Sequence, residues 1–246
     1  LELHWGILLA VLFVLVADQK MLRTGRRKTV YIMLILAVGV IGTLFQGSIS
    51  NDNQTPIYRS RNFFGVLTVW EESPEDKEEH KLLLQHGTTY HGLQFQSPEK
   101  KLIPTAYYSR GSGVGHLMRV LPENDGRKIG IVGLGVGTIA IYGTPEDTIV
   151  FYEINPDVVR IAEEYFTYLS ASPAAIDIVL GDARLSMENQ PPQNYDILVL
   201  DAFSSDAVPI HLLTAEAFEI YLRHLAPDGV LAFHTVSYTH LTLPTN

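Results

Sequence analysis

Glycines and acidic residues stand at the ends of four apolar segments, and this arrangement suits the binding of a nucleoside. A Gly-rich turn begins at Gly133, and Glu153, Asp182 and Asp201 stand at the ends of the next three segments. In an open α/β sheet, ligands bind in the crevice outside the carboxyl ends of the parallel strands. We therefore expect these four positions to surround one binding crevice.

The Gly-rich turn allows the backbone to approach a ligand closely. It reads Gly133-Leu134-Gly135-Val136-Gly137-Thr138 and precedes a helical stretch. Glycine permits tight turns, and the N–H groups at the start of a helix can face a ligand. Gly133, Gly135 and Gly137 are therefore candidate ligand contacts, although a Gly-rich turn after a strand is a weak signal by itself.

The acids have roles that fit a nucleoside. Glu153 follows Gly133 by 20 residues, and an acid at this spacing can accept hydrogen bonds from both ribose hydroxyls. Asp182 could accept a hydrogen bond from the exocyclic amine of an adenine, and the adjoining Ala183 is a further candidate contact. The alternative is that each acid is only a helix N-cap or a turn residue.

The apolar segments predict a doubly wound α/β domain over residues 111–236, with a mostly parallel sheet of the Rossmann type found in methyltransferases. Asn155 and Pro156 give the N-cap and first-turn signal of one helix, and Thr214 caps another that runs to Leu225. The expected strands are 128–132, 148–154, 176–180, 195–200 and 229–235. Such a sheet would bring the four strand ends together.

Residues 51–110 are predicted to form a small antiparallel β unit. Residues 64–70 alternate as a strand would, and 80–85 and 90–95 are further candidate strands. Turns that contain glycine and many charged residues join them.

Residues 1–50 are expected to form a membrane anchor. The runs 3–17 and 29–45 contain no Lys, Arg, Asp or Glu, and both are slightly shorter than the roughly 20 residues of a spanning helix. We expect two transmembrane helices; the alternatives are a signal peptide for one run and a buried helical hairpin. Five basic residues between the runs predict a cytoplasmic loop. That would place residue 51 onward on the opposite side, in conflict with a cytosolic nucleoside, so the side stays open.

Composition argues against several classes of partner. From residue 51 onward the chain holds 13 basic and 25 acidic side chains, whereas nucleic-acid binding needs clustered Lys and Arg. The absence of cysteine excludes disulfides and thiolate metal sites. No metal is expected from the histidines either, because His80, His86 and His91 lack a ligand spacing. His211 and His234 fall near the candidate site and could assist proton transfer, or could be structural.

Family motifs are spread over residues 59–235. They are Asn62-Phe63-Phe64-Gly65-Val66, His86-Gly87-Thr88-Thr89-Tyr90-His91-Gly92-Leu93-Gln94, Pro104 with Tyr107-Tyr108, the turn at Gly133, Tyr152-Glu153-Ile154-Asn155-Pro156, Gly181-Asp182-Ala183-Arg184 and Asp201-Ala202-Phe203-Ser204-Ser205-Asp206. Together they resemble the spermidine synthase (polyamine aminopropyltransferase) family. The resemblance is closest to bacterial membrane proteins that carry such a domain behind transmembrane helices.

This resemblance implies transfer of an aminopropyl group to a polyamine or another amine. The donor would be decarboxylated S-adenosylmethionine, a co-substrate, with no prosthetic group. A location in the bacterial inner membrane, contact with its lipids and a homodimer are further expectations.

The resemblance also assigns roles to residues. Gln94 and Tyr108 would contact the donor or close over it. Glu153 would hold its ribose, Asp182 its adenine, and Asp201 would be the base, because an amine must lose a proton before it displaces the carbon of a sulfonium. Asp206 is a candidate for binding the amine substrate.

Three departures from the family pattern keep other functions open. The family usually has Gly-Gly-Gly-Asp-Gly in its turn, with an acid that is expected to bind the donor's propylamine, where this chain has Val136. Asp201 and Asp206 are five residues apart rather than three. No acid follows Tyr107-Tyr108. Methyl transfer from S-adenosylmethionine is the leading alternative, and a non-catalytic, membrane-tethered binding module is another.

Residues 237–246 match neither the family's expected continuation nor the rest of the fold. We expect them to be a non-native tail on a truncated gene. The final strands of the sheet would then be missing, which would leave a sheet edge uncovered.

Overall fold

The computed structural model describes residues 55–120, 126–202 and 208–234. The two predicted transmembrane helices, at 3–17 and 29–45, and the predicted tail lie outside these ranges. Among the described residues, no helix is long and apolar enough to cross a bilayer. The chain from Pro56 onward forms one compact unit, which contains every element discussed below.

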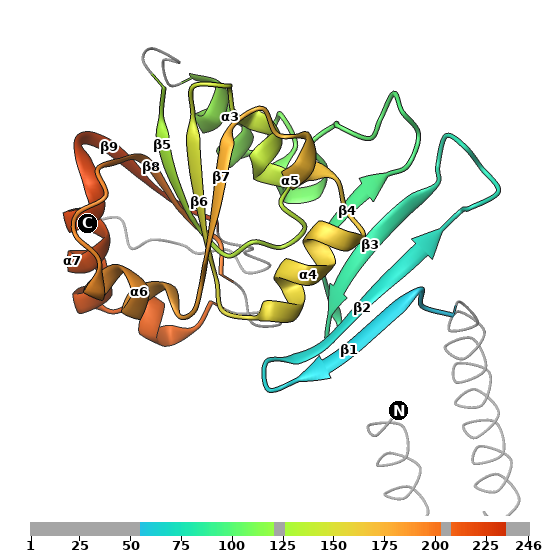
Figure 1. The fold of residues 1–246 in the computed structure, drawn as a ribbon, viewed down its shortest axis with the longest axis horizontal. Coiled ribbons are helices and arrows are strands. Elements are labelled where there is room, and N and C mark those ends of the chain that lie inside the picture. The colour runs from blue at the N-terminus through green and yellow to red at the C-terminus, as the bar shows by residue number, and fades with distance from the viewer. Residues whose placement is uncertain (1–54, 121–125, 203–207, 235–246) are drawn as a thin grey trace, which may run out of the picture. The chain divides into compact units, whose positions relative to one another are not determined.

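The first part of this unit is a four-stranded antiparallel sheet, as predicted. Its strands are β1 (Tyr58–Asn62), β2 (Gly65–Glu72), β3 (Lys81–His86) and β4 (Thr89–Phe95), and they lie in sequence order. Each strand pairs with the next; short turns join β1 to β2 and β3 to β4, and a longer loop, residues 73–80, joins β2 to β3 (Figure 1). Three strands correspond to predicted segments, and β1 was not predicted.

The second sheet has five strands, and all of its pairs are parallel. Its strands are β5 (Lys128–Val132), β6 (Thr148–Glu153), β7 (Ala175–Leu180), β8 (Tyr195–Leu200) and β9 (Leu225–Phe233). The order across the sheet is β7-β6-β5-β8-β9. Strands β6 and β7 are added on one side of β5, and β8 and β9 are added on its other side, so the order of the strands reverses between β5 and β8. Ligands bind at such a switch point in open α/β sheets. The predicted parallel α/β fold is therefore confirmed.

Helices cover both faces of the parallel sheet. They are η2 (Ala106–Tyr108), α3 (Gly113–Val120), η3 (Thr138–Tyr142), α4 (Pro156–Glu164), α5 (Tyr168–Ala171), α6 (Ala183–Asn189), η4 (Ile210–Leu212) and α7 (Ala215–His224). Asn155, Asp182 and Thr214 each cap the helix that follows, by accepting a hydrogen bond from a backbone N–H. The predicted helix after the Gly-rich turn is the short 3₁₀ helix η3 rather than an α-helix.

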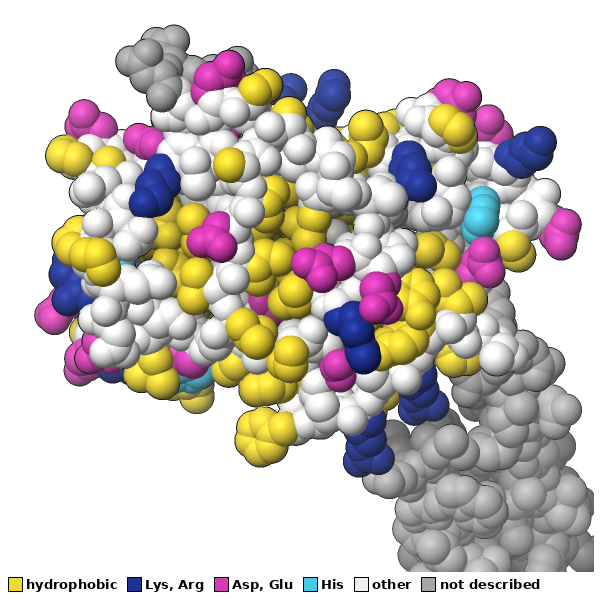
Figure 2. Space-filling view, in the orientation of Figure 1, with side chains coloured by type: hydrophobic (Ala, Val, Ile, Leu, Met, Phe, Trp, Pro, Cys, Tyr) yellow, Lys and Arg dark blue, Asp and Glu magenta, His cyan; other side chains and the backbone are white. Residues whose placement is uncertain are grey.

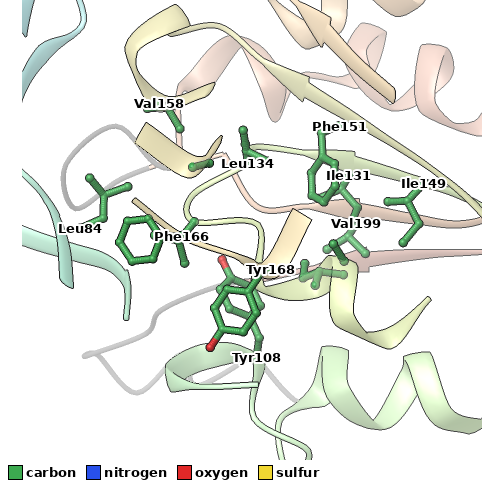
Figure 3. Close-up of a cluster of buried hydrophobic side chains, with 14 of the residues drawn as sticks. Leu84, Tyr108, Ile131, Leu134, Ile149, Phe151, Val158, Phe166, Tyr168 and Val199 are labelled. Atoms are coloured by element: carbon green, nitrogen blue, oxygen red, sulfur yellow. The ribbon is translucent and has the colours of Figure 1, made fainter. Parts of the chain in front are cut away.

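Two hydrophobic cores lie on opposite faces of this sheet. One joins β5, β6 and β8 to α3, η3, α4 and α5, and it includes buried side chains of β2 and β3. Figure 3 shows part of it, with Leu84 of β3 in the same cluster as Phe166 and Ile131. The other core packs α6 and α7 against β5, β6 and β8. The shared core fixes the antiparallel sheet beside the carboxyl ends of the parallel strands.

Asn155 connects the antiparallel sheet to α4. Its Oδ1 accepts hydrogen bonds from the N–H of Asp157 at 3.0 Å and from Nδ2 of Asn62, at the end of β1, at 2.7 Å. We expect Asn155→Ala to lower the free energy of unfolding by about 0.5–2 kcal/mol, because a helix cap is lost. Urea denaturation measures this. Glu75→Ala, at an exposed turn position, is the control and should stay within about 0.5 kcal/mol; equal stability of the two variants would contradict the capping role.

Charged side chains of both signs are interspersed on the molecular face drawn in Figure 2, with hydrophobic side chains gathered near its middle. This face therefore combines charged side chains of both signs with an exposed apolar area.

Candidate nucleoside-binding site

A cavity of about 790 Å³ lies at the carboxyl ends of β5, β6 and β8. Its wall combines the strand ends of the parallel sheet with residues of the antiparallel sheet and of the segment around η2. Among the predicted site residues, seven line it: Tyr108, Gly133, Gly135, Glu153, Asp182, Ala183 and Asp201. The volume falls within the usual range for pockets that bind a nucleoside-sized ligand.

The Gly-rich turn contributes Gly133 and Gly135 to this cavity, with φ angles of 99° and 55°. Gly137 has a φ of 79° but does not line the cavity; a Cβ there would lie 2.8 Å from the side chain of Leu169. Gly137 therefore serves the close packing of the turn against α5. The prediction of a ligand contact at this position is not supported by its place in the fold.

Val136 is also turned away from the cavity. Its side chain is only 1% exposed and belongs to the hydrophobic core. It packs on β4 at Gly92, where a Cβ would lie 2.4 Å from Cγ2 of Val136. The apolar residue that replaces the family's acid thus holds the turn against the antiparallel sheet.

Glu153 ends β6 with its carboxylate buried beneath the turn. One oxygen accepts the N–H of Leu134 at 3.0 Å, and the other accepts the N–H of Asn155 at 2.8 Å. Burial raises the pKa of this carboxyl, and hydrogen bonds from backbone N–H groups partly oppose that shift. Each carboxylate oxygen has a second acceptor site. The side chain can therefore order the turn and still accept two hydroxyl groups of a ligand.

Asp182 caps α6 and also lines the cavity, so a role as a helix cap does not exclude a position in the site. Its Oδ1 accepts the N–H of Leu185 at 2.9 Å, and its Oδ2 lies 2.8 Å from Nε2 of His211. Ala183, the first residue of α6, lies buried beside it in the cavity wall. Its small side chain leaves room for a flat ring at this edge.

Asp201 follows β8, beside the start of the Gly-rich turn, and its side chain is the centre of a polar cluster in the cavity wall. Its Oδ2 accepts a hydrogen bond from the hydroxyl of Tyr108, and its Oδ1 lies 2.6 Å from Nδ1 of His234. Burial and the neighbouring carboxylate raise the pKa of Tyr108 well above its ordinary value, so the phenol remains a hydrogen-bond donor. All three side chains line the cavity.

Gln94, another predicted site residue, lies away from the cavity wall. Gln94 is fully buried, and its amide bonds to the backbone oxygen of Lys101 and to both the hydroxyl and the N–H of Thr167. It does not line the cavity, because these groups occupy its side chain inside the fold. It ties β4 to the segment before α5, and its predicted contact with the donor is not supported. Asp206 lies outside the described residues.

The antiparallel sheet supplies cavity residues that the sequence did not single out by role. Phe63, Phe64, His86 and His91 line the cavity, and Phe63 is 96% exposed at the turn after β1. His86 donates from Nε2 to the backbone oxygen of Phe64 at 2.7 Å. These residues belong to the motifs that carried the family resemblance, which was the available signal. Among the described residues, no group of three or more His, Asp or Glu could hold a metal ion.

The sequence is similar to those of known transferases. The chain is 28% identical to the polyamine aminopropyltransferase of Vibrio vulnificus over 215 residues. The match covers 85% of this chain and 68% of that protein. The chain is thus similar to a polyamine aminopropyltransferase over most of its length. No protein-family model matches it. A stretch of 106 residues is also 31% identical to an N-terminal histidine N-methyltransferase of Emericella nidulans, over 42% of this chain and 19% of that protein.

Solved structures show the same fold. A probable spermidine synthase of Corynebacterium glutamicum matches 73% of this chain with a TM-score of 0.58 and 21% identity. The spermidine synthase of Thermotoga maritima matches 72% with a TM-score of 0.51 and 14% identity. The matched regions span 64% and 56% of those two chains. The predicted resemblance to this family is therefore confirmed, for a chain that spans less than two thirds of the solved relatives.

Proposed function

We propose that this protein transfers an aminopropyl group from decarboxylated S-adenosylmethionine to an amine, with a polyamine as the acceptor. The observation that carries the proposal is one cavity whose wall combines the Gly-rich turn and Glu153 with the polar cluster around Asp201. The kinship with a polyamine aminopropyltransferase supports the same reaction.

The chemistry assigns different tasks to different parts of the cavity wall. Gly133, Gly135 and Glu153 would hold the ribose of the donor, and Asp182 its adenine. Asp201 would attract the ammonium groups of the acceptor and take part in removing a proton, which exposes the lone pair of the nitrogen. That nitrogen then displaces the thioether nucleoside from the propyl carbon. The donor's sulfonium makes this displacement favourable because a neutral thioether leaves.

Methyl transfer from S-adenosylmethionine is the second candidate. The observation that favours it is Val136, whose buried side chain cannot bind the propylammonium group that distinguishes the decarboxylated donor. The partial match to a methyltransferase points the same way.

Calorimetry on the 246-residue chain with each donor separates these functions. We expect the decarboxylated donor to bind more tightly than S-adenosylmethionine, and mass spectrometry to detect an aminopropylated polyamine. A preference for the carboxylate-bearing donor together with a methylated amine would support methyl transfer instead. Failure of both donors to bind would reject both enzymatic functions and favour a binding module.

Glu153→Gln tests the ribose contact. We expect donor affinity to fall about 10- to 100-fold, because hydrogen bonds to a charged acceptor contribute about 1.5–3 kcal/mol. In the parent chain, donor affinity should also fall as the pH is lowered, and at a higher pH than an ordinary glutamate would require, because burial raises the pKa of Glu153. Calorimetry measures both effects.

Glu164→Gln, on the exposed face of α4, is the matched control and should bind the donor as the parent does. Circular dichroism verifies that both variants are folded at the temperature of the titration. Unchanged affinity in folded Glu153→Gln would remove this residue from the site.

We further propose that residues 3–17 and 29–45 anchor the protein in a bacterial inner membrane as a multi-pass protein. The support is two uncharged apolar runs separated by a basic loop. The chain should stay in the membrane fraction at alkaline pH, and a reporter fused after residue 50 should give the side of the catalytic unit. Release by alkaline carbonate would contradict the anchor.

A homodimer is also proposed, and light scattering in detergent measures it.

A further inference from the structure

The carboxylate of Asp201 is engaged on both of its oxygens. Tyr108 donates its hydroxyl to Oδ2, and His234 contacts Oδ1 through Nδ1 at 2.6 Å. The side chains of Asp201 and His234 are only 7% and 15% exposed. Both oxygens of Asp201 are therefore arranged to hold neighbouring side chains.

The same hydrogen bond sets the state of the imidazole. A carboxylate oxygen can only accept, so Nδ1 of His234 carries a hydrogen, and in the neutral ring the lone pair then lies on Nε2. The ring contacts the rings of Tyr107 and Tyr108, with centroid distances of 5.3 and 5.7 Å, and it lines the cavity. An aspartate bound to Nδ1 orients an imidazole as a general base and stabilises its protonated form.

We propose that His234 is the general base of the transfer reaction and that Asp201 is its positioning residue. This inference rests on the proposed function and names the group that accepts the proton. Imidazoles ordinarily bind a proton ~400-fold more tightly than aspartate carboxylates. An alkylammonium group therefore loses its proton more readily to an imidazole than to a carboxylate.

The proposed step is balanced in atoms and charge. The acceptor's ammonium gives one proton to Nε2 of His234, which becomes an imidazolium paired with Asp201. The freed nitrogen lone pair forms a bond to the propyl carbon, while the bond from that carbon to sulfur breaks and its electron pair stays on sulfur. The products are a neutral thioether nucleoside and a substituted ammonium ion.

Three described side chains contact the imidazole of His234. Asp201 lies at the end of β8, and Tyr107 and Tyr108 lie in η2. A second pair of imidazole and carboxylate, His211 with Asp182 at 2.8 Å, lies in the same cavity wall. The other titratable side chains of the wall are Glu153, His86, His91, Tyr90 and Tyr152. His211 is therefore the proper comparison for any effect on the pH profile.

The test measures kcat and kcat/KM against pH for the 246-residue chain with the decarboxylated donor and a polyamine. The parent's rate should rise with pH as an imidazole loses its proton. His234→Asn keeps an N–H for Asp201 but has no basic nitrogen. It should lower kcat about 10²- to 10⁴-fold and abolish this rise, with donor affinity within about 3-fold of the parent. Added imidazole should restore part of the turnover of His234→Ala, and His211→Gln should keep the pH-dependent rise.

The outcomes separate this inference from the function on which it rests. If the parent transfers the aminopropyl group and folded His234→Asn keeps its kcat and pH profile, the inference is overturned and the function stands. If the parent neither binds the donor nor transfers the group, both are overturned. Should His234→Asn melt at the assay temperature, His234→Gln is measured in its place by the same criteria.

Discussion

Replacement of Asp201 by asparagine should lower kcat by about 10³- to 10⁴-fold, the scale of loss seen when an aspartate that orients a catalytic imidazole becomes an amide. The amide has no charge to attract an ammonium group, and it cannot accept from both Tyr108 and His234 as the carboxylate does. Because the amide also presents N–H groups, it favours the imidazole tautomer that places the lone pair on Nδ1. Donor affinity should change much less, since the ribose and adenine contacts lie at other strand ends.

Steady-state kinetics and donor calorimetry together measure this difference between kcat and affinity. Asp228→Asn is the matched control, because that aspartate lies exposed in β9 and does not line the cavity. It should retain the parent's kinetics. Turnover of Asp201→Asn within about tenfold of the parent would show that neither charge nor orientation at this position matters to the reaction, and would contradict both roles given to Asp201.

The parallel sheet was predictable because buried parallel strands are apolar along their whole length and are bounded by caps and glycines. Strand β1 was not predictable in this way. Its sequence, Tyr58-Arg59-Ser60-Arg61-Asn62, is polar, and it is an edge strand that forms through its pairing with β2. The short length of η3 was not predicted either, because it depends on packing against distant residues rather than on the local sequence pattern.

The candidate site was predictable where one strand end determines a position, as at Glu153, Asp182 and Asp201. It was not predictable where a contact joins distant segments. Val136 is buried because Gly92 of β4 lies on it, and His234 reaches Asp201 because β8 and β9 pair with Leu200 beside Phe233. Neither pairing is encoded in local spacing. The family pattern identified the absence of an acid at position 136 but not the packing that replaced it.

Gly133→Ala should destabilise the fold strongly for so small a substitution. The φ of Gly133 is 99°, and a Cβ there would lie 2.5 Å from the backbone oxygen of Asp201. Backbone atoms cannot rotate away as a side chain can, so either the turn or the end of β8 must shift. Strain and overpacking together should lower the free energy of unfolding by roughly 2–6 kcal/mol, which urea denaturation measures.

Gly111→Ala makes the same chemical change where a Cβ would meet nothing within 4 Å, so it should leave stability within about 0.5 kcal/mol of the parent. The two variants also differ in what they predict for function. A shift of the backbone at Gly133 moves Asp201, whose N–H bonds to the oxygen of Val132 at 2.8 Å. Donor affinity and kcat should therefore fall together in folded Gly133→Ala, whereas Asp201→Asn lowers kcat alone. Equal stability of the two alanine variants would mean that the close approach of β5 and β8 at the switch point does not constrain the site.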